Sequence, residues 1–163
     1  IMATRLKNPK RIIALDVDER LFSFALECGA DEVLNAADPQ LNDKIRDLTN
    51  GLGPSIFIEA SGSAVSLKTG VDLLMKGGTM VVYGVYGTET SMNWSIISEF
   101  KELKVLGGHL APNMFTTCID LLTEGKLSAP RIITHEVPLK DFELGLKMKE
   151  TVSEPVLKVL LKP

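Results

Sequence analysis

The sequence has no long apolar run, and it is poor in cysteine, histidine and tryptophan. No apolar stretch approaches the roughly 18 residues that a membrane-spanning helix needs, and nothing resembles a signal peptide. We therefore expect no membrane partner and a cytoplasmic location. Lys and Arg are scattered and the net charge is −3, which argues against a nucleic-acid surface. A small soluble ligand is the expected partner.

The few cysteines and histidines leave little for metal or thiol chemistry. Cys28 and Cys118 lie far apart with no metal-ligand spacing around them, so they are most simply small buried side chains. His109 follows "VLGG" at an expected strand exit and either faces a ligand cleft or is a structural histidine. His135 has no acidic or nucleophilic partner nearby in sequence. No metal or nucleophile motif occurs, so no catalytic or metal residue is predicted in this chain.

Short runs rich in valine and isoleucine alternate with segments of helical period, which is typical of crossover connections and a mostly parallel sheet. We predict an α/β fold, and 163 residues with 45% hydrophobic content suit one globular domain. The predicted strands are 11–15, 32–34, 55–59, 79–84, 104–108, 132–137 and 156–161. The predicted helices are 1–6, 18–28, 39–50, 64–75, 112–124 and 139–150.

Asp16 directly follows the apolar run "RIIAL". A carboxylate at the carboxyl end of such a strand accepts hydrogen bonds from the adenosine ribose of a dinucleotide and repels a 2′-phosphate, which selects NAD over NADP. The alternative is a turn aspartate ahead of the next helix, although Asp18 is the better-placed N-cap. On this residue alone both interpretations stay open.

Two later strand exits are rich in small residues. In "IEASGSA" a strand ends in Ser-Gly-Ser before a helix, and in "GGTMVVYGVYG" the strand exit carries two glycines. Small residues there let a ligand approach the backbone, although Ser63 also suits an ordinary helix cap. Since the carboxyl ends of parallel strands lie at one edge of a sheet, these exits and Asp16 predict a ligand site at that edge.

Residues 84–103 interrupt the alternation of strands and helices. The apolar stretch from Met92 to Ile97 either forms an exposed edge strand that pairs with another subunit or crosses the sheet as an ordinary loop.

The order of these pieces resembles the cofactor domain of the medium-chain, zinc-type alcohol dehydrogenase family over essentially the whole chain. The residues that carry the resemblance are "ALDVDERL…ECGADEVLN…LTNGLGPSIFIEASGSAVSLKTGVDLLMKGGTMVVYGVYG…SMNW…LKVLGG…LLTEGKL…ITHEVPLKDFELGLKMKE…KVLL". Within the family, "NWSIISEFKELKVLGGHLAP" looks most like polyol and sugar-alcohol dehydrogenases of the erythritol, threitol or sorbitol type. The stretch "SMNW" matches the edge through which family members pair, so a homo-oligomer is expected.

The resemblance implies a Rossmann-type doubly wound sheet and NAD-dependent oxidation of an alcohol, in which a catalytic zinc polarises the alkoxide and hydride passes to the nicotinamide. It implies one partial Rossmann domain over residues 1–163, with residues 130–163 returning toward the catalytic domain. The cofactor-binding residues that it implies are Asp16, Val17, Arg20, Ser61, Gly62, Tyr83, Val85, His109 and Lys158.

Among these residues, Asp16 matches the position that binds the adenosine ribose, and Ser61 with Gly62 match the wall of the adenine ribose pocket. Tyr83, Val85 and His109 match positions near the nicotinamide carboxamide, contributed largely through backbone. Lys158 matches a basic position that reaches the pyrophosphate.

The chain departs from the family pattern in three ways. The G-x-G-x-x-G loop with its preceding strand is absent, and the zinc ligands and proton-relay residues of the family lie upstream of Ile1, so zinc is expected only on a missing catalytic domain. Members often place a basic residue five positions after the ribose-binding acid, whereas Leu21 stands there and Arg20 precedes it. A helix points Arg20 about 100° away from the usual direction.

In the expected strand order 3-2-1-4-5-6, the absent first strand would lie between residues 11–15 and 55–59. Unpaired buried backbone groups cost about 1–3 kcal/mol each, so we expect a longer polypeptide to supply that strand and the chain to be inactive alone. Two other interpretations stay open: a zinc-free NADPH quinone reductase relative, and a non-catalytic adenine-nucleotide or S-adenosylmethionine-binding module.

Overall fold

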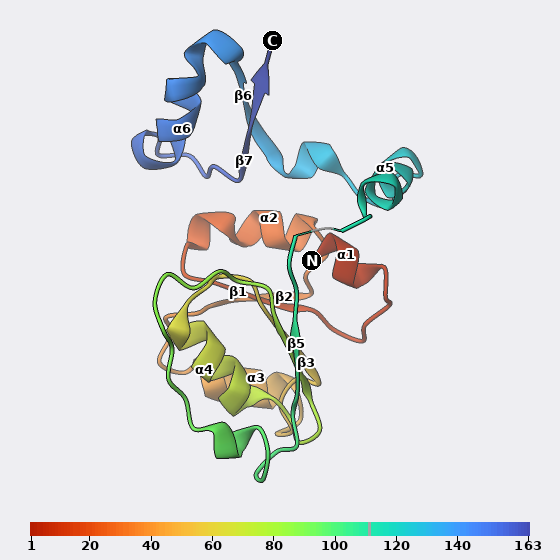
Figure 1. Ribbon diagram of the computed structural model, residues 1–163, viewed down its shortest axis with the longest axis vertical. Helices are drawn as coiled ribbons and strands as arrows, with labels where there is room; N and C mark the ends of the chain where they lie inside the picture. The colour runs from red at the N-terminus through yellow and green to blue at the C-terminus, as the bar shows by residue number, and fades with distance from the viewer. Residues whose placement is uncertain (111) are drawn as a thin grey trace. The chain divides into compact units, whose positions relative to one another are not determined.

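The computed structural model describes residues 1–110 and 112–163 (Figure 1). Strands pair in parallel and alternate with helices, which confirms the predicted α/β class. Contacts divide the chain into two compact units. Unit 1 consists of Ile1–Ala37 with Asn113–Pro163, and unit 2 of Asp38–Pro112.

Unit 1 contains two separate parallel strand pairs, β1 with β2 and β6 with β7. In the first pair Asp16 stands opposite Asn35, and in the second a register shift falls between Ile133 and His135. In Figure 1, α6 lies beside the β6–β7 pair, which it contacts. The elements of unit 1 are α1 (Met2–Arg5), β1 (Ile13–Asp16), η1 (Glu19–Leu21), α2 (Phe22–Glu27), β2 (Glu32–Asn35), α5 (Phe115–Thr123), η3 (Ala129–Arg131), β6 (Ile133–Pro138), η4 (Leu139–Asp141), α6 (Phe142–Thr151) and β7 (Lys158–Lys162).

Asp31 ties the start of β1 to the turn that leads into β2. Its Oδ2 accepts hydrogen bonds from the backbone N–H of Ile12 at 2.7 Å and from the Arg5 guanidinium at 2.7 Å. Arg5 Nε also donates to the carbonyl of Gly29 at 3.0 Å. These bonds link α1, α2 and the β1–β2 pair, so the strand that ends in Asp16 has a fixed starting point.

Unit 2 contains a three-stranded parallel sheet of order β3-β4-β5. The register places Glu59, Val82 and Gly107 side by side at its carboxyl edge. Its core packs α4 against the sheet and consists of Leu67, Val71, Leu74, Met80 and Leu103. The elements of unit 2 are α3 (Leu41–Leu48), β3 (Ile56–Glu59), α4 (Ala64–Leu73), β4 (Thr79–Val82), η2 (Trp94–Ile96) and β5 (Lys104–Gly107).

The carboxyl end of α4 is held by one lysine. Lys101 Nζ donates hydrogen bonds to the carbonyls of Val71 at 2.9 Å, Asp72 at 2.6 Å and Leu74 at 2.8 Å. The last carbonyls of a helix have no partner within the helix and carry partial negative charge, so a cation is favourable there. Burial lowers the pKa of Lys101.

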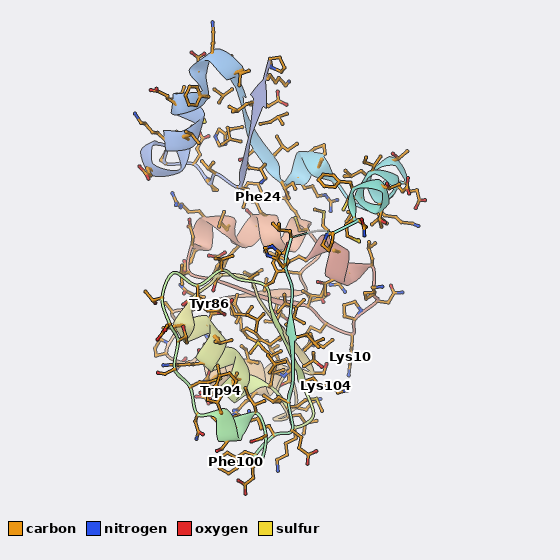
Figure 2. All side chains as sticks on the ribbon, viewed as in Figure 1. Lys10, Phe24, Tyr86, Trp94, Phe100 and Lys104 are labelled. Atoms are coloured by element: carbon orange, nitrogen blue, oxygen red, sulfur yellow. The ribbon has the colours of Figure 1, made fainter. Side chains whose placement is uncertain are left out.

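We expect Lys101→Met to lower the free energy of unfolding by about 1–3 kcal/mol, because it leaves these three carbonyls without their donor. Urea titration followed by circular dichroism measures this change. The matched control is Lys104→Met, which replaces an exposed lysine on β5 (Figure 2) and should change the free energy by about 0.5 kcal/mol or less. Equal losses in the two variants would refute the capping role.

All seven predicted strands and all six predicted helices are present, with their ends shifted by a few residues. The helices predicted over 18–28 and 139–150 begin as the 3-10 turns η1 and η4, and η3 was not predicted. None of the described helices combines the length and hydropathy that crossing a membrane requires.

Of the two alternatives for the stretch from Met92 to Ile97, the exposed edge strand is not formed. The 3-10 turn η2 lies there, because Asn93 Oδ1 accepts the N–H of Ser95 at 3.0 Å and caps a helical turn. Met92 and Ile97 pack against the core of unit 2. The prediction that Cys118 is buried is wrong: it is exposed on α5, a helix with no buried residue, and Cys28 is half-buried.

Candidate functional site

The carboxyl edge of the β3-β4-β5 sheet brings several predicted site residues together. Ser61 and Gly62 follow β3, Tyr83 and Val85 follow β4, and His109 follows β5. Because the three strands end in register, these residues leave the sheet at one edge. The backbone N–H groups of Tyr83 and Gly84 both donate to the Glu59 carbonyl, at 2.8 and 2.9 Å, and the Tyr83 hydroxyl donates to the Leu110 carbonyl at 3.3 Å.

The exits of β3 and β4 touch backbone to backbone. Gly62 has φ of +72°, and a Cβ at this position would lie 2.2 Å from the Val85 carbonyl oxygen. A Cβ on Gly84 would lie 2.3 Å from the Gly62 nitrogen. Only glycine allows both the positive φ and this contact. Val85 is 90% exposed, so this edge presents the apolar Val85 side chain to solvent beside the backbone.

Glu59 is a site residue that we did not predict. Its side chain is fully buried at the end of β3. Oε1 accepts the Ser61 N–H at 2.9 Å and the Ser61 hydroxyl at 2.5 Å, and Oε2 accepts the Tyr86 hydroxyl at 2.6 Å. The Gly62 N–H lies 3.2 Å from both oxygens. The sequence feature that indicates this role is an acidic residue at the end of an apolar strand, directly before the small residues of "ASGS".

The serine hydroxyl groups of the Ser61–Ser63 turn form hydrogen bonds with neighbouring protein groups. Ser61 Oγ accepts the N–H of Ser63 at 3.1 Å in addition to donating to Glu59, so Ser61 offers a ligand mainly its backbone. Ser63 Oγ accepts the N–H of Ser66 at 3.4 Å and caps α4, which confirms the predicted cap. Small residues at this exit therefore form a turn and also bring backbone to the sheet edge.

The hydrogen bonds around Glu59 decide its charge. Burial alone would raise the pKa of this carboxyl group, but the hydrogen bonds from Ser61, Tyr86 and Gly62 outweigh it and the pKa lies below its usual value. Burial, then the hydrogen bond to Glu59 and its charge, raise the pKa of the Tyr86 hydroxyl. Glu59 is therefore an ionised acceptor at neutral pH, and Tyr86 is a neutral donor.

A carboxyl group whose pKa is lower in the folded than in the unfolded state stabilises the fold at pH values above the unfolded pKa, which is about 4.3 for glutamate. This stabilisation is lost as the pH falls through the folded pKa. We therefore expect the free energy of unfolding to fall on acidification from pH 7 to pH 3 more steeply in the wild type than in Glu59→Gln. Urea titrations across this range measure the slope. Glu99→Gln, which changes an exposed carboxylate, should keep the wild-type slope. Equal slopes in all three proteins would contradict the assignment.

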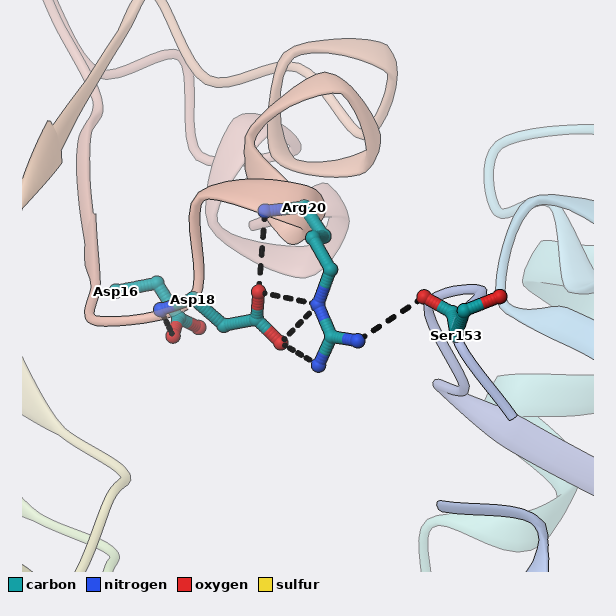
Figure 3. A network of polar contacts seen from close by, with 4 residues as sticks. All are labelled: Asp16, Asp18, Arg20 and Ser153. Carbon is teal, nitrogen blue, oxygen red and sulfur yellow. Dashed lines mark hydrogen bonds and ion pairs between the residues drawn. The ribbon is translucent and has the colours of Figure 1, made fainter. Parts of the chain in front are cut away.

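In unit 1, Asp16 lies at the end of β1 (Figure 3), which pairs with β2 in a sheet separate from β3-β4-β5, so the predicted single sheet edge for Asp16 and the later exits is not formed. Its Oδ1 accepts the N–H of Asp18 at 3.0 Å, and no hydrogen bond to its second oxygen is formed by the described residues. Asp18 is the cap of η1, as predicted, because its Oδ1 accepts the N–H of Arg20 at 3.1 Å. Asp16 therefore closes a turn with one oxygen and has the other available to a ligand.

The Arg20 guanidinium is fixed by hydrogen bonds to Asp18 and Ser153 (Figure 3). Its guanidinium donates to both carboxylate oxygens of Asp18, with Nε 2.8 Å from Oδ1 and one terminal nitrogen 2.7 Å from Oδ2. The other terminal nitrogen donates to the Ser153 carbonyl at 3.1 Å. The positive charge of Arg20 is thus paired with Asp18, which leaves less of it for a ligand phosphate.

The remaining predicted residues have plain environments. Val17 is exposed beside Asp16, Lys158 is the exposed first residue of β7, and His109 is exposed. His135 is half-buried, with Nδ1 2.9 Å from the Thr134 hydroxyl. The described residues contain no cluster of three or more His, Cys, Asp or Glu side chains that could hold a metal ion.

The family described as zinc-binding dehydrogenase matches residues 1–124. An erythritol/L-threitol dehydrogenase from Mycolicibacterium smegmatis is 40% identical over 163 residues, covering 100% of this chain and 45% of the relative. A sorbitol dehydrogenase from Halalkalibacterium halodurans is 29% identical over 154 residues, covering 93% and 44%. The chain therefore spans less than half the length of these curated relatives.

Two solved structures of similar fold carry nicotinamide cofactors. A short chain alcohol dehydrogenase from Escherichia coli CFT073, complexed with NADH, is 26% identical with a TM-score of 0.86 over 96% of this chain and 45% of that one. A zinc-binding dehydrogenase from Sinorhizobium meliloti 1021, bound to NADP, is 25% identical with a TM-score of 0.84 over 100% of this chain and 48% of that one. The two structures hold different cofactors, so the choice between NAD and NADP has to come from the residues of this chain.

Proposed function

Because the chain belongs to the zinc-binding dehydrogenase family, we propose that it is the NAD-binding portion of an alcohol or polyol dehydrogenase. The reaction would transfer hydride from a secondary alcohol to NAD. The relatives named erythritol/L-threitol dehydrogenase and sorbitol dehydrogenase support a polyol as the substrate class.

The observation that carries the proposal is the glycine contact at the carboxyl edge of unit 2. Gly62 and Gly84 let the β3 and β4 exits pack backbone to backbone, and this edge is where open parallel sheets bind ligands. A cofactor can approach the backbone there. Ser61, Gly62, Tyr83, Val85 and His109 are proposed to contact it.

Asp16 is proposed to accept hydrogen bonds from the adenosine ribose through its second oxygen, with Val17 beside it and Lys158 toward the pyrophosphate. Arg20 is retained as a weaker candidate, because it is paired with Asp18. NAD would supply the hydride acceptor, and the residues named here would hold and orient it. Since the described residues hold no cluster of three His, Cys, Asp or Glu side chains, zinc is proposed to bind the part of the relatives that this chain does not match.

Three further proposals follow from the family. Residues 1–163 form one partial Rossmann domain, with 130–163 returning toward a catalytic domain. The protein acts in the cytoplasm. It forms a homo-oligomer through residues 92–97. The support for this proposal is that the large apolar side chain of Trp94 on η2 (Figure 2) is 68% exposed.

Calorimetric titration of the protein with NADH, NADPH and S-adenosylmethionine tests the proposed function. We expect NADH to bind, NADPH to bind at least about tenfold more weakly because Asp16 repels its 2′-phosphate, and S-adenosylmethionine not to bind. Tighter binding of NADPH would support the quinone reductase relative, and binding of S-adenosylmethionine alone would support the non-catalytic module. Either result would overturn the proposal.

A further inference from the structure

Glu59 joins the turn after β3 to the loop after β4. Its donors come from the turn after β3, through Ser61 and Gly62, and from the loop after β4, through Tyr86. The carbonyl of the same residue accepts the N–H groups of Tyr83 and Gly84. One residue therefore connects the two exits through both its side chain and its backbone.

We infer that Glu59 is a positioning residue of the cofactor site and that Tyr86 completes it by holding the loop after β4 against the carboxylate. The inference rests on the proposed function. Glu59 lies at the sheet edge but does not face a ligand itself, because its side chain is fully buried. It acts by deciding which backbone atoms of Ser61, Gly62 and Val85 face a ligand.

The carboxylate is suited to this task because it accepts and never donates. Both of its oxygens take N–H or O–H donors, and a buried donor without an acceptor is costly. A glutamine at position 59 has one acceptor oxygen, and its amide nitrogen would face the Tyr86 hydroxyl or the Gly62 N–H. The turn would have to rearrange to satisfy the donors that remain.

The effect should stay local. The core cluster of unit 2 is built from α4, β4 and Leu103, and it does not include Glu59. Tyr86 packs against this cluster through its ring, which Tyr86→Phe preserves. Loss of the hydroxyl should therefore loosen the turn and leave α4 in place.

The test compares the wild type with Glu59→Gln, Tyr86→Phe and the double variant, with Glu99→Gln as control. Amide hydrogen exchange is followed by NMR at Ser61 and Gly62 and, as internal reference, at residues 67 and 71 of α4, and NADH affinity is measured on the same proteins. We expect both single variants to speed exchange at Ser61 and Gly62 roughly tenfold or more and to weaken NADH binding by a similar factor, with α4 unchanged. The double variant should lose little more than the worse single variant, because the two side chains share one network.

Unchanged exchange at Ser61 and Gly62, or an equal increase in α4, would overturn the inference. Faster exchange with unchanged NADH affinity would also overturn it, since the pair would then be structural only. If the wild type does not bind NADH, the result concerns the proposed function and the absent G-x-G-x-x-G loop, and not the role of Glu59. The exchange data alone then decide whether Glu59 and Tyr86 hold the turn.

Discussion

Replacing Gly62 by alanine is expected to lower the free energy of unfolding by about 3 kcal/mol and to abolish measurable NADH binding. The added Cβ would lie 2.2 Å from the Val85 carbonyl oxygen, and this partner is backbone that cannot swing aside. The exits of β3 and β4 would have to separate, which moves the atoms proposed to face the cofactor. Urea titration and calorimetric NADH titration measure the two effects.

Gly77 provides a matched control for this substitution. It has the same φ of +72°, but a Cβ there would meet no atom within 4 Å. Gly77→Ala should therefore lower the free energy of unfolding by only about 1–2 kcal/mol, the cost of placing alanine in the left-handed conformation, and leave NADH affinity unchanged. If Gly62→Ala and Gly77→Ala have equal effects on both quantities, the contact between the two exits has no role in binding.

Replacing Asp16 by asparagine is expected to reduce the preference for NADH over NADPH about 10–100-fold. Asparagine keeps an oxygen for the N–H of Asp18, which Asp16 Oδ1 accepts at 3.0 Å, so the turn should survive. It removes the negative charge that would repel a 2′-phosphate and that would accept hydrogen bonds from the ribose hydroxyls.

The ratio of the two dissociation constants, measured by calorimetry, tests this expectation. Asp43→Asn replaces an exposed carboxylate on α3 and should leave the ratio unchanged. An unchanged ratio in Asp16→Asn would exclude Asp16 from cofactor selection. A changed ratio accompanied by a loss of stability would point to a broken turn instead, which urea titration distinguishes.

Much of the fold could be predicted because its elements follow from local patterns. The apolar runs that became β1 and β4 are bounded by Asp16 and by the glycines of "YGVYG", so their carboxyl ends were visible before any pairing was known. The parallel register then brings Glu59, Val82 and Gly107 to one edge. Periodicity and turn residues carry this information without long-range contacts.

The errors arise where one side chain overrides the local pattern. The apolar run after Met92 left an edge strand and a loop open, and the turn that forms depends on the Asn93 cap and on Ile97 packing against a core that no local pattern reveals. The role of Glu59 could not be predicted because its partner Tyr86 is distant in sequence. A buried carboxylate needs hydrogen-bond donors, and these come from the segments after β3 and after β4. The pairing of Arg20 with Asp18 likewise depends on the rotamer that the turn allows.

The most direct test of the central claim is to map NADH binding by amide chemical shifts in two-dimensional NMR. We predict that NADH shifts the resonances of Asp16 and Val17 after β1 and of Ser61, Gly62 and Val85 after β3 and β4. Resonances in α3, for example Ile45, should not move. Saturable binding that leaves the strand-exit resonances unchanged and shifts others would contradict the account.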